Sequence, residues 1–318
     1  MRLAFLFPGQ GAQAVGMGRA LAERYPEAQA VFAAADHALG FRLSEICWEG
    51  PEERLRETRH AQPALLTHSI AALRLLELHG FAPSWCAGHS LGEYSACVAA
   101  GALDFEEAVR LVHRRGELMY QAGRDRPGTM AAILGLARED VDAACAEAGP
   151  AGIVQAANLN APGQIVISGE IPAVERACEL AKARGARRAI PLEVSGAFHS
   201  PLMAAAAAGL RERLHAVRFA DARCPIVPNV SAEPVQARGE VRRALEEQLL
   251  GAVRWEDSMR CLLRSGAEGF VEIGTGKVLR GLLRTIDKEA PSWNVEDPDS
   301  LQATLTALSA ATPAGGGS

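Results

Sequence analysis

Gly88-His89-Ser90-Leu91-Gly92 is the stretch that decides the fold, because it matches the pattern G-x-S-x-G. In that pattern the two small residues permit a strained strand-to-helix turn that exposes the serine hydroxyl. A short apolar segment at residues 84–89 runs into the motif, and we expect a helix to follow it. This context favours a nucleophilic serine over the alternative, a glycine-rich turn that happens to contain a serine.

Predicted strands and helices alternate on both sides of this motif. Residues 3–7 form an unbroken apolar run that predicts a buried strand, and after Pro8 a loop leads to a helical pattern at about 17–35. Further helical patterns occupy roughly 62–79 and 104–122. Such alternation predicts an α/β fold with a parallel sheet.

The middle of the chain has a different pattern. Strands and helices are predicted in the order β-α-β-β-α-β, at residues 129–136, 138–148, 153–158, 164–168, 172–184 and 187–194. This is the order of a ferredoxin-like unit. We therefore expect a ferredoxin-like subdomain at residues 126–193, inserted into the larger domain.

Beyond the insert the first pattern returns. It comprises a helix from Pro201, a strand near 225–230, a helix near 240–250, the strand Gly269–Ile273 and a helix from about Lys277. The large domain is thus expected to be discontinuous, made of residues 1–125 and 194–290. Residues 291–318, which end in Ala-Gly-Gly-Gly-Ser, are expected to form a C-terminal tail.

The composition argues against several classes of protein. No run of about 18 uncharged apolar residues exists, so no membrane-spanning helix is expected. The N-terminus has no signal-peptide pattern, which makes the cytoplasm the expected location. The formal net charge of -5 argues against nucleic-acid binding. The 7 cysteines are scattered and form no C-x-x-C pair, so we expect neither a disulfide framework nor a metal site.

A serine hydroxyl needs a base within hydrogen-bond reach before it can act as a nucleophile. Of the 8 histidines, His199 lies in a loop just before Ser200 and Pro201, which resemble the N-cap and first position of a helix. A rigidly presented loop histidine is the better candidate for the base. We give His89, the neighbour of the serine, a supporting role. The backbone N–H of Leu91 is the expected oxyanion donor.

Arg115 is a cation on the apolar face of the predicted helix 104–122. The apolar stripe of that helix leads from Phe105 through Val112 to Arg115 and then to Met119. A guanidinium placed against the core is costly unless a carboxylate or phosphate pairs with it. Two explanations stay open at this point: an anion-binding site, or an internal ion pair with an aspartate or glutamate.

Two glycine-containing segments match nucleotide-binding loops only in part. Gly9, Gly11 and Ala14 satisfy G-x-G-x-x-A, but no second strand ending in an acidic residue follows about 20 positions later. We expect these glycines instead to let Gln10 approach the site. Residues 274–277, Gly-Thr-Gly-Lys, lack the earlier glycine and the Ser or Thr of a P-loop, and we interpret them as a strand-to-helix turn.

Taken together, the motifs resemble those of the malonyl-CoA:acyl carrier protein transacylase family, which includes the acyltransferase domains of fatty acid and polyketide synthases. The resemblance covers about residues 1–290 and rests on six segments, at 7–13, 88–93, 115–119, 160–164, 196–200 and 272–279. It implies an α/β-hydrolase-like large domain with a parallel sheet and an inserted ferredoxin-like subdomain, in agreement with the segmentation above.

The resemblance also implies roles for the residues that could carry out the reaction. It makes Ser90 the acyl acceptor and His199 the base, in a dyad without an acidic third member. Arg115 would bind the malonyl carboxylate. Gln10 and the Leu91 N–H would form the oxyanion pocket.

Four further residues receive roles from the resemblance alone. Met119 and Asn160 are implied to contact the substrate, and a phenylalanine at Phe198 goes with malonyl rather than methylmalonyl groups. The backbone carbonyl of Gln248 is implied to orient His199. The residues that follow it, Gly251-Ala252, depart from the commoner Asn-Pro of the family.

The implied reaction is a ping-pong transfer, in which Ser90 takes the malonyl group from malonyl-CoA and the phosphopantetheine thiol of acyl carrier protein then removes it. No bound cofactor is implied, and we expect a monomer. One alternative is a G-x-S-x-G thioesterase or hydrolase, which predicts an acidic third residue and no role for Arg115. A non-catalytic module would be expected to lack Ser90 or His199. A discrete trans-acting acyltransferase of a polyketide synthase, or the transacylase of malonate decarboxylase, stays open.

Overall fold

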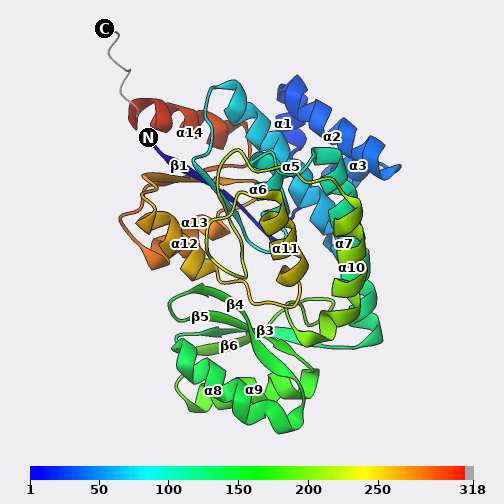
Figure 1. Cartoon of the computed structure of the whole chain (residues 1–318), viewed down its shortest axis with the longest axis vertical. Helices are drawn as coiled ribbons and strands as arrows, with labels where there is room; N and C mark the ends of the chain where they lie inside the picture. The colour runs from blue at the N-terminus through cyan, green and yellow to red at the C-terminus, as the bar shows by residue number, and fades with distance from the viewer. Residues whose placement is uncertain (312–318) are drawn as a thin grey trace.

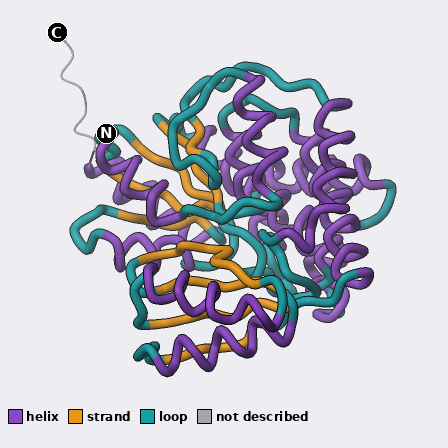
Figure 2. Tube along the Cα trace, turned by 60° about the horizontal axis from the view of Figure 1, so that its bottom comes forward, coloured by secondary structure: helices purple, strands orange, loops and turns teal. Residues whose placement is uncertain are grey.

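The computed structural model describes residues 1–311 and contains two sheets with helices around them (Figure 1). The strands are β1 (Leu3–Phe7), β2 (Trp85–Gly88), β3 (Thr129–Leu134), β4 (Val154–Ala161), β5 (Gln164–Gly169), β6 (Arg188–Pro191), β7 (Ile226–Val227), β8 (Gly269–Ile273) and β9 (Ser292–Val295). The helices are α1 (Arg19–Arg24), α2 (Pro26–Leu39), α3 (Leu43–Glu49), α4 (Glu52–Arg56), α5 (Thr58–Leu78), α6 (Gly92–Ala99), α7 (Phe105–Asp125), α8 (Arg138–Ala148), α9 (Ile171–Ala183), α10 (Ala204–Ala216), α11 (Arg238–Gln248), α12 (Trp255–Arg264), α13 (Val278–Ile286) and α14 (Pro298–Ala311). Figure 2 shows the strands of both sheets on one side of the molecule and a bundle of helices on the other.

Strand β1 lies at the centre of the large sheet, whose strand order is β7-β2-β1-β8-β9 with every neighbouring pair parallel. Leu3, Phe5 and Phe7 point to one face, where they join the core formed with α5, α6 and α7. Ala4 and Leu6 point to the other face and join the core formed with α12 and α13. Because helices cover both faces, β1 is apolar throughout, as parallel strands buried on both sides are. The predicted parallel sheet is confirmed.

The small sheet is antiparallel, with the strand order β4-β5-β3-β6. Its strands and helices follow one another as β3-α8-β4-β5-α9-β6, the ferredoxin-like order that the sequence predicts. Helices α8 and α9 pack on the face turned away from the large domain, with Val141 and Val174 in their core (Figure 1). On the opposite face Met130 and Val166 join the core of the large domain. The predicted fold class, a parallel sheet with a ferredoxin-like insert, is confirmed.

The helix predicted over 17–35 is in fact two helices, α1 and α2, which meet at Tyr25. Tyr25 has an extended backbone, with φ -126° and ψ 115°, and Pro26 begins the next helix. The proline ring disfavours the helical conformation of the residue before it, so a continuous helix is excluded at this point. Helix α12 was not predicted either.

The prediction of a C-terminal tail from residue 291 is wrong for residues 292–311. Strand β9 pairs in parallel with β8 and completes the edge of the large sheet. Helix α14 follows and buries Leu301, Leu305 and Leu308. Ser292–Val295 is too short and too weakly apolar to indicate a strand by itself. It forms one because its backbone groups pair with those of β8. Residues 312–318, the rest of the predicted tail, lie outside the described residues.

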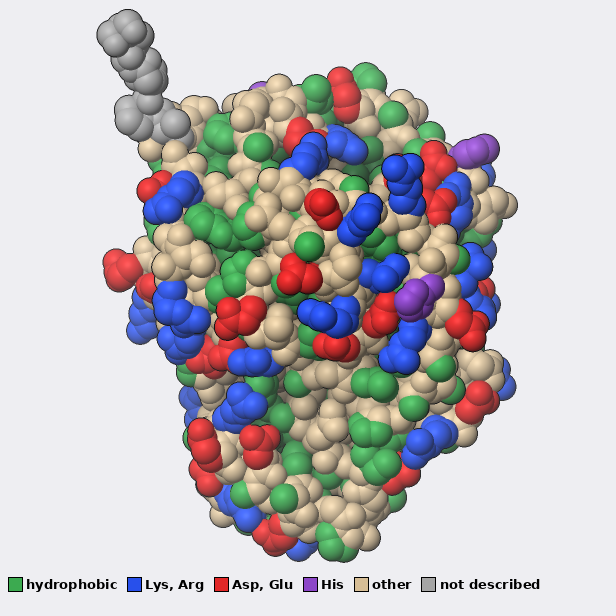
Figure 3. Space-filling view, viewed as in Figure 1, with side chains coloured by type: hydrophobic (Ala, Val, Ile, Leu, Met, Phe, Trp, Pro, Cys, Tyr) green, Lys and Arg blue, Asp and Glu red, His purple; other side chains and the backbone are tan. Residues whose placement is uncertain are grey.

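The surface carries charges of both signs. The face seen in Figure 3 shows acidic and basic side chains interspersed, in keeping with 33 Lys and Arg against 38 Asp and Glu in the whole sequence. No helix within residues 1–311 combines the length and the apolar character needed to cross a membrane.

Candidate active site

Ser90 occupies the sharp turn between β2 and α6. Its φ is 51°, in the left-handed region that side chains seldom adopt, so the turn holds the serine in a strained conformation. The glycines on either side make this turn possible. A Cβ on Gly88 would overlap the backbone of Gly92, and one on Gly92 would overlap the carbonyl of Phe7. The strand-turn-helix context predicted for G-x-S-x-G is therefore present.

His199 lies opposite the serine, with its Nε2 atom 2.8 Å from Ser90 Oγ. The other ring nitrogen, Nδ1, is 3.0 Å from the carbonyl oxygen of Gln248 and 3.2 Å from that of Gly251. Carbonyl oxygens can only accept hydrogen bonds, so Nδ1 carries the proton and Nε2 is left with a free lone pair. That lone pair faces the serine hydroxyl, which is the geometry a general base requires.

The electrostatic surroundings keep His199 uncharged. Burial, followed by the positive charge of Arg115, lowers the pKa of His199 to about 3. The imidazole is therefore neutral at neutral pH and able to accept a proton from Ser90.

Arg115 extends from α7 into the same site and is only 1% exposed. Its Nη1 donates to Gln62 Oε1 at 2.8 Å, and its Nη2 donates to Ser90 Oγ and Gln248 Oε1, each at 3.1 Å. The guanidinium also lies 5.5 Å from the ring centre of Tyr94. Among residues 1–311 no carboxylate lies within ion-pair distance of Arg115, so the internal ion pair considered above is not formed. Burial lowers the pKa of Arg115, because the charged form loses hydration.

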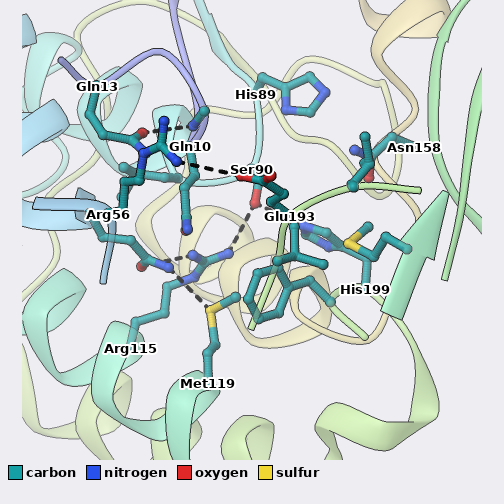
Figure 4. Close-up of a pocket in the computed structure, with 17 residues that line it drawn as sticks. Gln10, Gln13, Arg56, His89, Ser90, Arg115, Met119, Asn158, Glu193 and His199 are labelled. Atoms are coloured by element: carbon teal, nitrogen blue, oxygen red, sulfur yellow. Dashed lines mark hydrogen bonds and ion pairs between the residues drawn. The ribbon is translucent and has the colours of Figure 1, made fainter. Parts of the chain in front are cut away.

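These three side chains open into a cavity of about 410 Å³ between the two sheets. The large domain contributes Ser90 and Arg115, and the insert contributes Met130 from β3 and Asn158 from β4. Figure 4 shows Ser90, Arg115, Met119 and His199 converging on this space. The full lining comprises Gln10, Gly11, Gln13, Arg56, Gln62, His89, Ser90, Leu91, Arg115, Met119, Met130, Asn158, Leu192, Glu193, Val194, Phe198 and His199.

The cavity has a charged rim and an apolar wall. Arg56 and Glu193 are exposed and lie 3.4 Å apart. Met119, Met130 and Phe198 are buried and line the interior. In the part of the chain that the structure covers, no group of three or more His, Cys, Asp or Glu side chains could hold a metal ion.

Comparison with known proteins identifies the family. A family model described as the acyl transferase domain matches residues 4–299. The malonyl CoA-acyl carrier protein transacylase of Bacillus subtilis is 48% identical over 308 residues, which cover 96% of this chain and 97% of that protein. The chain belongs to the malonyl-CoA:acyl carrier protein transacylase family.

Solved structures of this transacylase family share the fold. An acyl carrier protein S-malonyltransferase from Vibrio cholerae superposes with a TM-score of 0.92 at 42% identity, covering 96% of this chain and 100% of that one. A malonyl-transacylase in complex with its holo type II polyketide synthase acyl carrier protein gives a TM-score of 0.94 at 43% identity, with 96% and 100% coverage.

Among the predicted site residues of this transacylase family member, all but Asn160 and Gln248 line the cavity. Gln248 lies behind His199 and faces it with its backbone carbonyl. Asn160 does not line the cavity, because its Oδ1 lies 2.8 Å from His89 Nε2 and holds that ring. Asn158, two residues earlier on β4, lines the cavity instead. Register shifts on either side of this segment re-aim the side chains of β4, which a bulged strand commonly does.

The two predicted oxyanion residues lie beside the nucleophile. Leu91 follows Ser90 in the turn, and Gln10 comes from the loop after β1. The side-chain Nε2 of Gln10 donates to Thr58 Oγ1 at 3.3 Å, which ties the loop to the start of α5.

Besides cavity-lining residues such as Met130 and Asn158, sequence reasoning gave no role to Gln62, Glu93 and Asn229. Gln62 accepts from Arg115, and Asn229 Oδ1 accepts from the Ser90 amide at 2.7 Å. Glu93 is buried directly behind the nucleophile turn. Glu93 could have been noticed, since an acidic residue follows G-x-S-x-G directly in an apolar helix. Gln62 and Asn229 gave no comparable signal.

Proposed function

We propose that this protein transfers a malonyl group from coenzyme A to the phosphopantetheine thiol of acyl carrier protein, through a malonyl ester on Ser90. The observation that carries the proposal is the buried Arg115 guanidinium. It lies within hydrogen-bond distance of the nucleophile and has only neutral partners among residues 1–311. An acyl group that carries a free carboxylate would supply the missing anion, because guanidinium and carboxylate pair through two parallel hydrogen bonds.

In the first half-reaction Ser90 Oγ attacks the thioester carbonyl carbon while its proton passes to His199 Nε2. The negative charge that develops on the carbonyl oxygen is stabilised by the Leu91 N–H and by Gln10. The carbon–sulfur bond then breaks. The coenzyme A thiolate takes the proton from the imidazolium, and the malonyl ester remains on the serine.

In the second half-reaction the thiol of the carrier protein gives its proton to His199 and attacks the ester carbonyl. The carbon–oxygen bond to Ser90 breaks, and Oγ recovers the proton from His199. The carbonyls of Gln248 and Gly251 face Nδ1 and stabilise the imidazolium in both halves. These carbonyls take the place that a carboxylate holds in a serine triad.

The apolar wall of the cavity provides selection among acyl groups. Phe198 adjoins the base in sequence and is 7% exposed, so its ring limits the space beside the ester. We propose that Phe198 and Met119 disfavour a methyl branch on the malonyl group. A pocket discriminates one carbon by about 1–3 kcal/mol, so the preference should be partial.

The enzyme is proposed to act as a monomer in the cytoplasm. Residues of this one chain are enough to bring the proposed nucleophile, base and anion-binding group together, so the site does not need a second copy. All 7 cysteines are free, as in proteins of reducing compartments. Size-exclusion chromatography with light scattering tests the oligomeric state.

Intact-mass spectrometry after mixing with malonyl-CoA tests the function. The protein should gain the mass of one malonyl group, and holo acyl carrier protein should remove it. Ser90→Ala should slow adduct formation by a factor of about 10⁴ or more, because the covalent route is lost. A malonyl adduct of unchanged stoichiometry in Ser90→Ala would refute the assignment of the nucleophile. Loss of the malonyl group to water at the same rate as to the carrier protein would indicate a hydrolase.

A further inference from the structure

Glu93 is a buried carboxylate in the first turn of α6, three residues after the nucleophile. It is 1% exposed. One of its oxygens, Oε2, accepts two hydrogen bonds, from the Asn229 backbone N–H at 2.9 Å and from Gln248 Nε2 at 2.9 Å. Within residues 1–311 no cation lies at ion-pair distance from it. A buried anion is costly, so its retention here calls for an explanation.

Through its hydrogen bond to Asn229, Glu93 is linked to the nucleophile. The Asn229 side chain accepts from the Ser90 N–H at 2.7 Å and donates to the Gly88 carbonyl at 2.7 Å. Asn229 thus clamps both ends of the strained turn at Ser90. Glu93 holds the backbone of Asn229 and thereby sets the position of the clamp.

Through its hydrogen bond to Gln248, Glu93 is linked to the base and to the anion-binding arginine. The amide of Gln248 accepts from Arg115 Nη2 at 3.1 Å through Oε1 and donates to the Ser90 carbonyl at 2.9 Å through Nε2. Its backbone carbonyl faces His199 Nδ1. Glu93 is therefore linked to Ser90, His199 and Arg115 through a single intervening residue, either Asn229 or Gln248.

We propose that Glu93 is a positioning residue that holds Ser90, His199 and Arg115 in register through Asn229 and Gln248, and that its negative charge balances Arg115 until a malonyl group binds. The inference rests on the proposed function, since it takes the malonyl carboxylate as the ligand of Arg115. A bound malonyl group then places a second anion beside a single guanidinium, so the charge on Glu93 opposes binding.

The groups that face Glu93 support a charge effect directed at Arg115. The titratable groups around it are the Arg115 guanidinium on α7 and, on α6 itself, the Tyr94 hydroxyl and the Cys97 thiol. Burial raises the pKa of both Tyr94 and Cys97, which keeps them neutral. The partners from outside these two helices, Asn229 and Gln248, carry only amides.

The direction of the pH effect follows from the surroundings of Glu93. Burial raises the pKa of Glu93 to about 7. Below that pH the carboxyl is neutral, and Oε2 can still accept both hydrogen bonds as a carbonyl oxygen. Above it the carboxylate repels the malonyl carboxylate. Malonyl binding should therefore weaken as the pH rises through neutrality, and acetyl binding should not.

The variant Glu93→Gln separates the charge from the hydrogen bonds. Its amide oxygen can occupy the place of Oε2 and accept from Asn229 and Gln248, while the charge is gone. We measure the acylation of the whole protein by malonyl-CoA and by acetyl-CoA at pH 6 and pH 8.5, by rapid quench and intact mass. At pH 8.5 the variant should show a KM for malonyl-CoA roughly tenfold below that of the parent, as expected for removal of a like charge at an effective dielectric constant of about 20. At pH 6 the variant and the parent should have the same KM for malonyl-CoA. With acetyl-CoA their KM values should be the same at either pH.

Two further variants complete the experiment. Glu93→Met keeps the volume but accepts no hydrogen bond, so kcat should fall with both substrates at every pH. Glu272→Gln is the matched control. Glu272 is also 1% exposed and its pKa is also raised to about 7, but it binds the backbone N–H groups of Leu279 and Arg280 away from the cavity. This control should leave the malonyl-to-acetyl ratio unchanged at both pH values.

The outcomes separate this inference from the proposed function. If Glu93→Gln shows the parent's malonyl-to-acetyl ratio at both pH values, the charge role is wrong. If Glu93→Met folds with the parent's melting temperature and keeps its kcat, the positioning role is wrong. Should Glu93→Met fail to fold, the malonyl-to-acetyl ratio of Glu93→Gln still tests the charge role. If the parent forms no malonyl ester on Ser90, the proposed function itself fails.

Discussion

The guanidinium of Arg115 is a buried cation that the fold satisfies with neutral oxygens only. The amides of Gln62 and Gln248 and the hydroxyl of Ser90 hold it in place without cancelling its charge. Glutamine at these two positions keeps the guanidinium oriented, whereas a glutamate would pair with it and compete with a substrate carboxylate. The side chains in direct contact with Arg115 thus leave its guanidinium free to pair with a carboxylate of the ligand.

Arg115→Ala should weaken malonyl transfer selectively. Truncating one member of a desolvated ion pair commonly costs about 2–5 kcal/mol, roughly 30- to several-thousand-fold. Acetyl-CoA has no free carboxylate, so its transfer should stay level or improve relative to malonyl. Both rates are measured beside a melting curve. Parallel loss of both activities with a large fall in melting temperature would show that Arg115 serves the fold rather than the substrate.

The rate of acylation by acetyl-CoA should be independent of pH around 6.5. A histidine in water is half protonated at about that pH and would lose its function as a base on the acid side. Burial and the charge of Arg115 lower the pKa of His199 to about 3, so the neutral form persists well below pH 6. The measurement is the single-turnover rate from pH 5 to pH 8. An inflection near 6.5 that disappears in a His199 variant would contradict this expectation.

At the scale of elements, the sequence predicted what local patterns determine. The apolar run at β1, the strand-to-helix turn at Ser90 and the β-α-β-β-α-β order of the insert follow from periodicity and turn residues. Strand β9 was missed because Ser292–Val295 is a short edge strand whose partner lies in β8. The pairing partner, and not the local sequence, defines such a strand.

The site residues likewise divide into those that local sequence indicates and those that depend on distant partners. Ser90, His199 and Arg115 carry chemistry that their own neighbours in the sequence reveal. The contacts of Asn229 with the nucleophile turn join residues about 140 positions apart, and no local pattern indicates them. Asn160 was misplaced because register shifts in β4 break the simple alternation of side chains that a regular strand has.

Helix α14 should contribute directly to stability. Leu308 is completely buried, and replacing a buried leucine with alanine commonly costs about 2–5 kcal/mol. Leu308→Ala should therefore lower the denaturant midpoint clearly. The exposed Gln302→Ala on the same helix should stay within about 0.5 kcal/mol of the parent. If the two variants unfold alike, the helix does not pack as described.

At the scale of the whole molecule, the cavity lies between the large domain and the insert and is lined by residues of both. Ser90 and Arg115 come from the large domain, and Met130 and Asn158 from the insert. A ligand that fills the cavity therefore touches both units and should stabilise them together.

Malonyl-CoA should raise the melting temperature of the Ser90→Ala variant, which can bind but not react. At a ligand concentration of about 100 times Kd the gain is about 2.7 kcal/mol, which shifts the melting temperature of a chain this size by several degrees. The shift should affect a single transition and should shrink in the Ser90→Ala, Arg115→Ala double variant. Two transitions of which only one responds would mean that the ligand contacts one unit alone.

The place of β1 at the centre of the large sheet has a consequence for synthesis on the ribosome. Leu3 pairs with Gly269, so β1 must wait for the synthesis of about 266 further residues before this second neighbour emerges. At about 5–20 residues per second this delay is roughly 13 to 53 s. The strands of the insert, from Thr129 to Pro191, pair among themselves apart from one bridge between Asn158 and Val253, and that sheet is complete long before β8 is made. Until β8 arrives, one edge of β1 stays open to other chains, so this apolar strand is a segment that a nascent-chain chaperone has reason to cover.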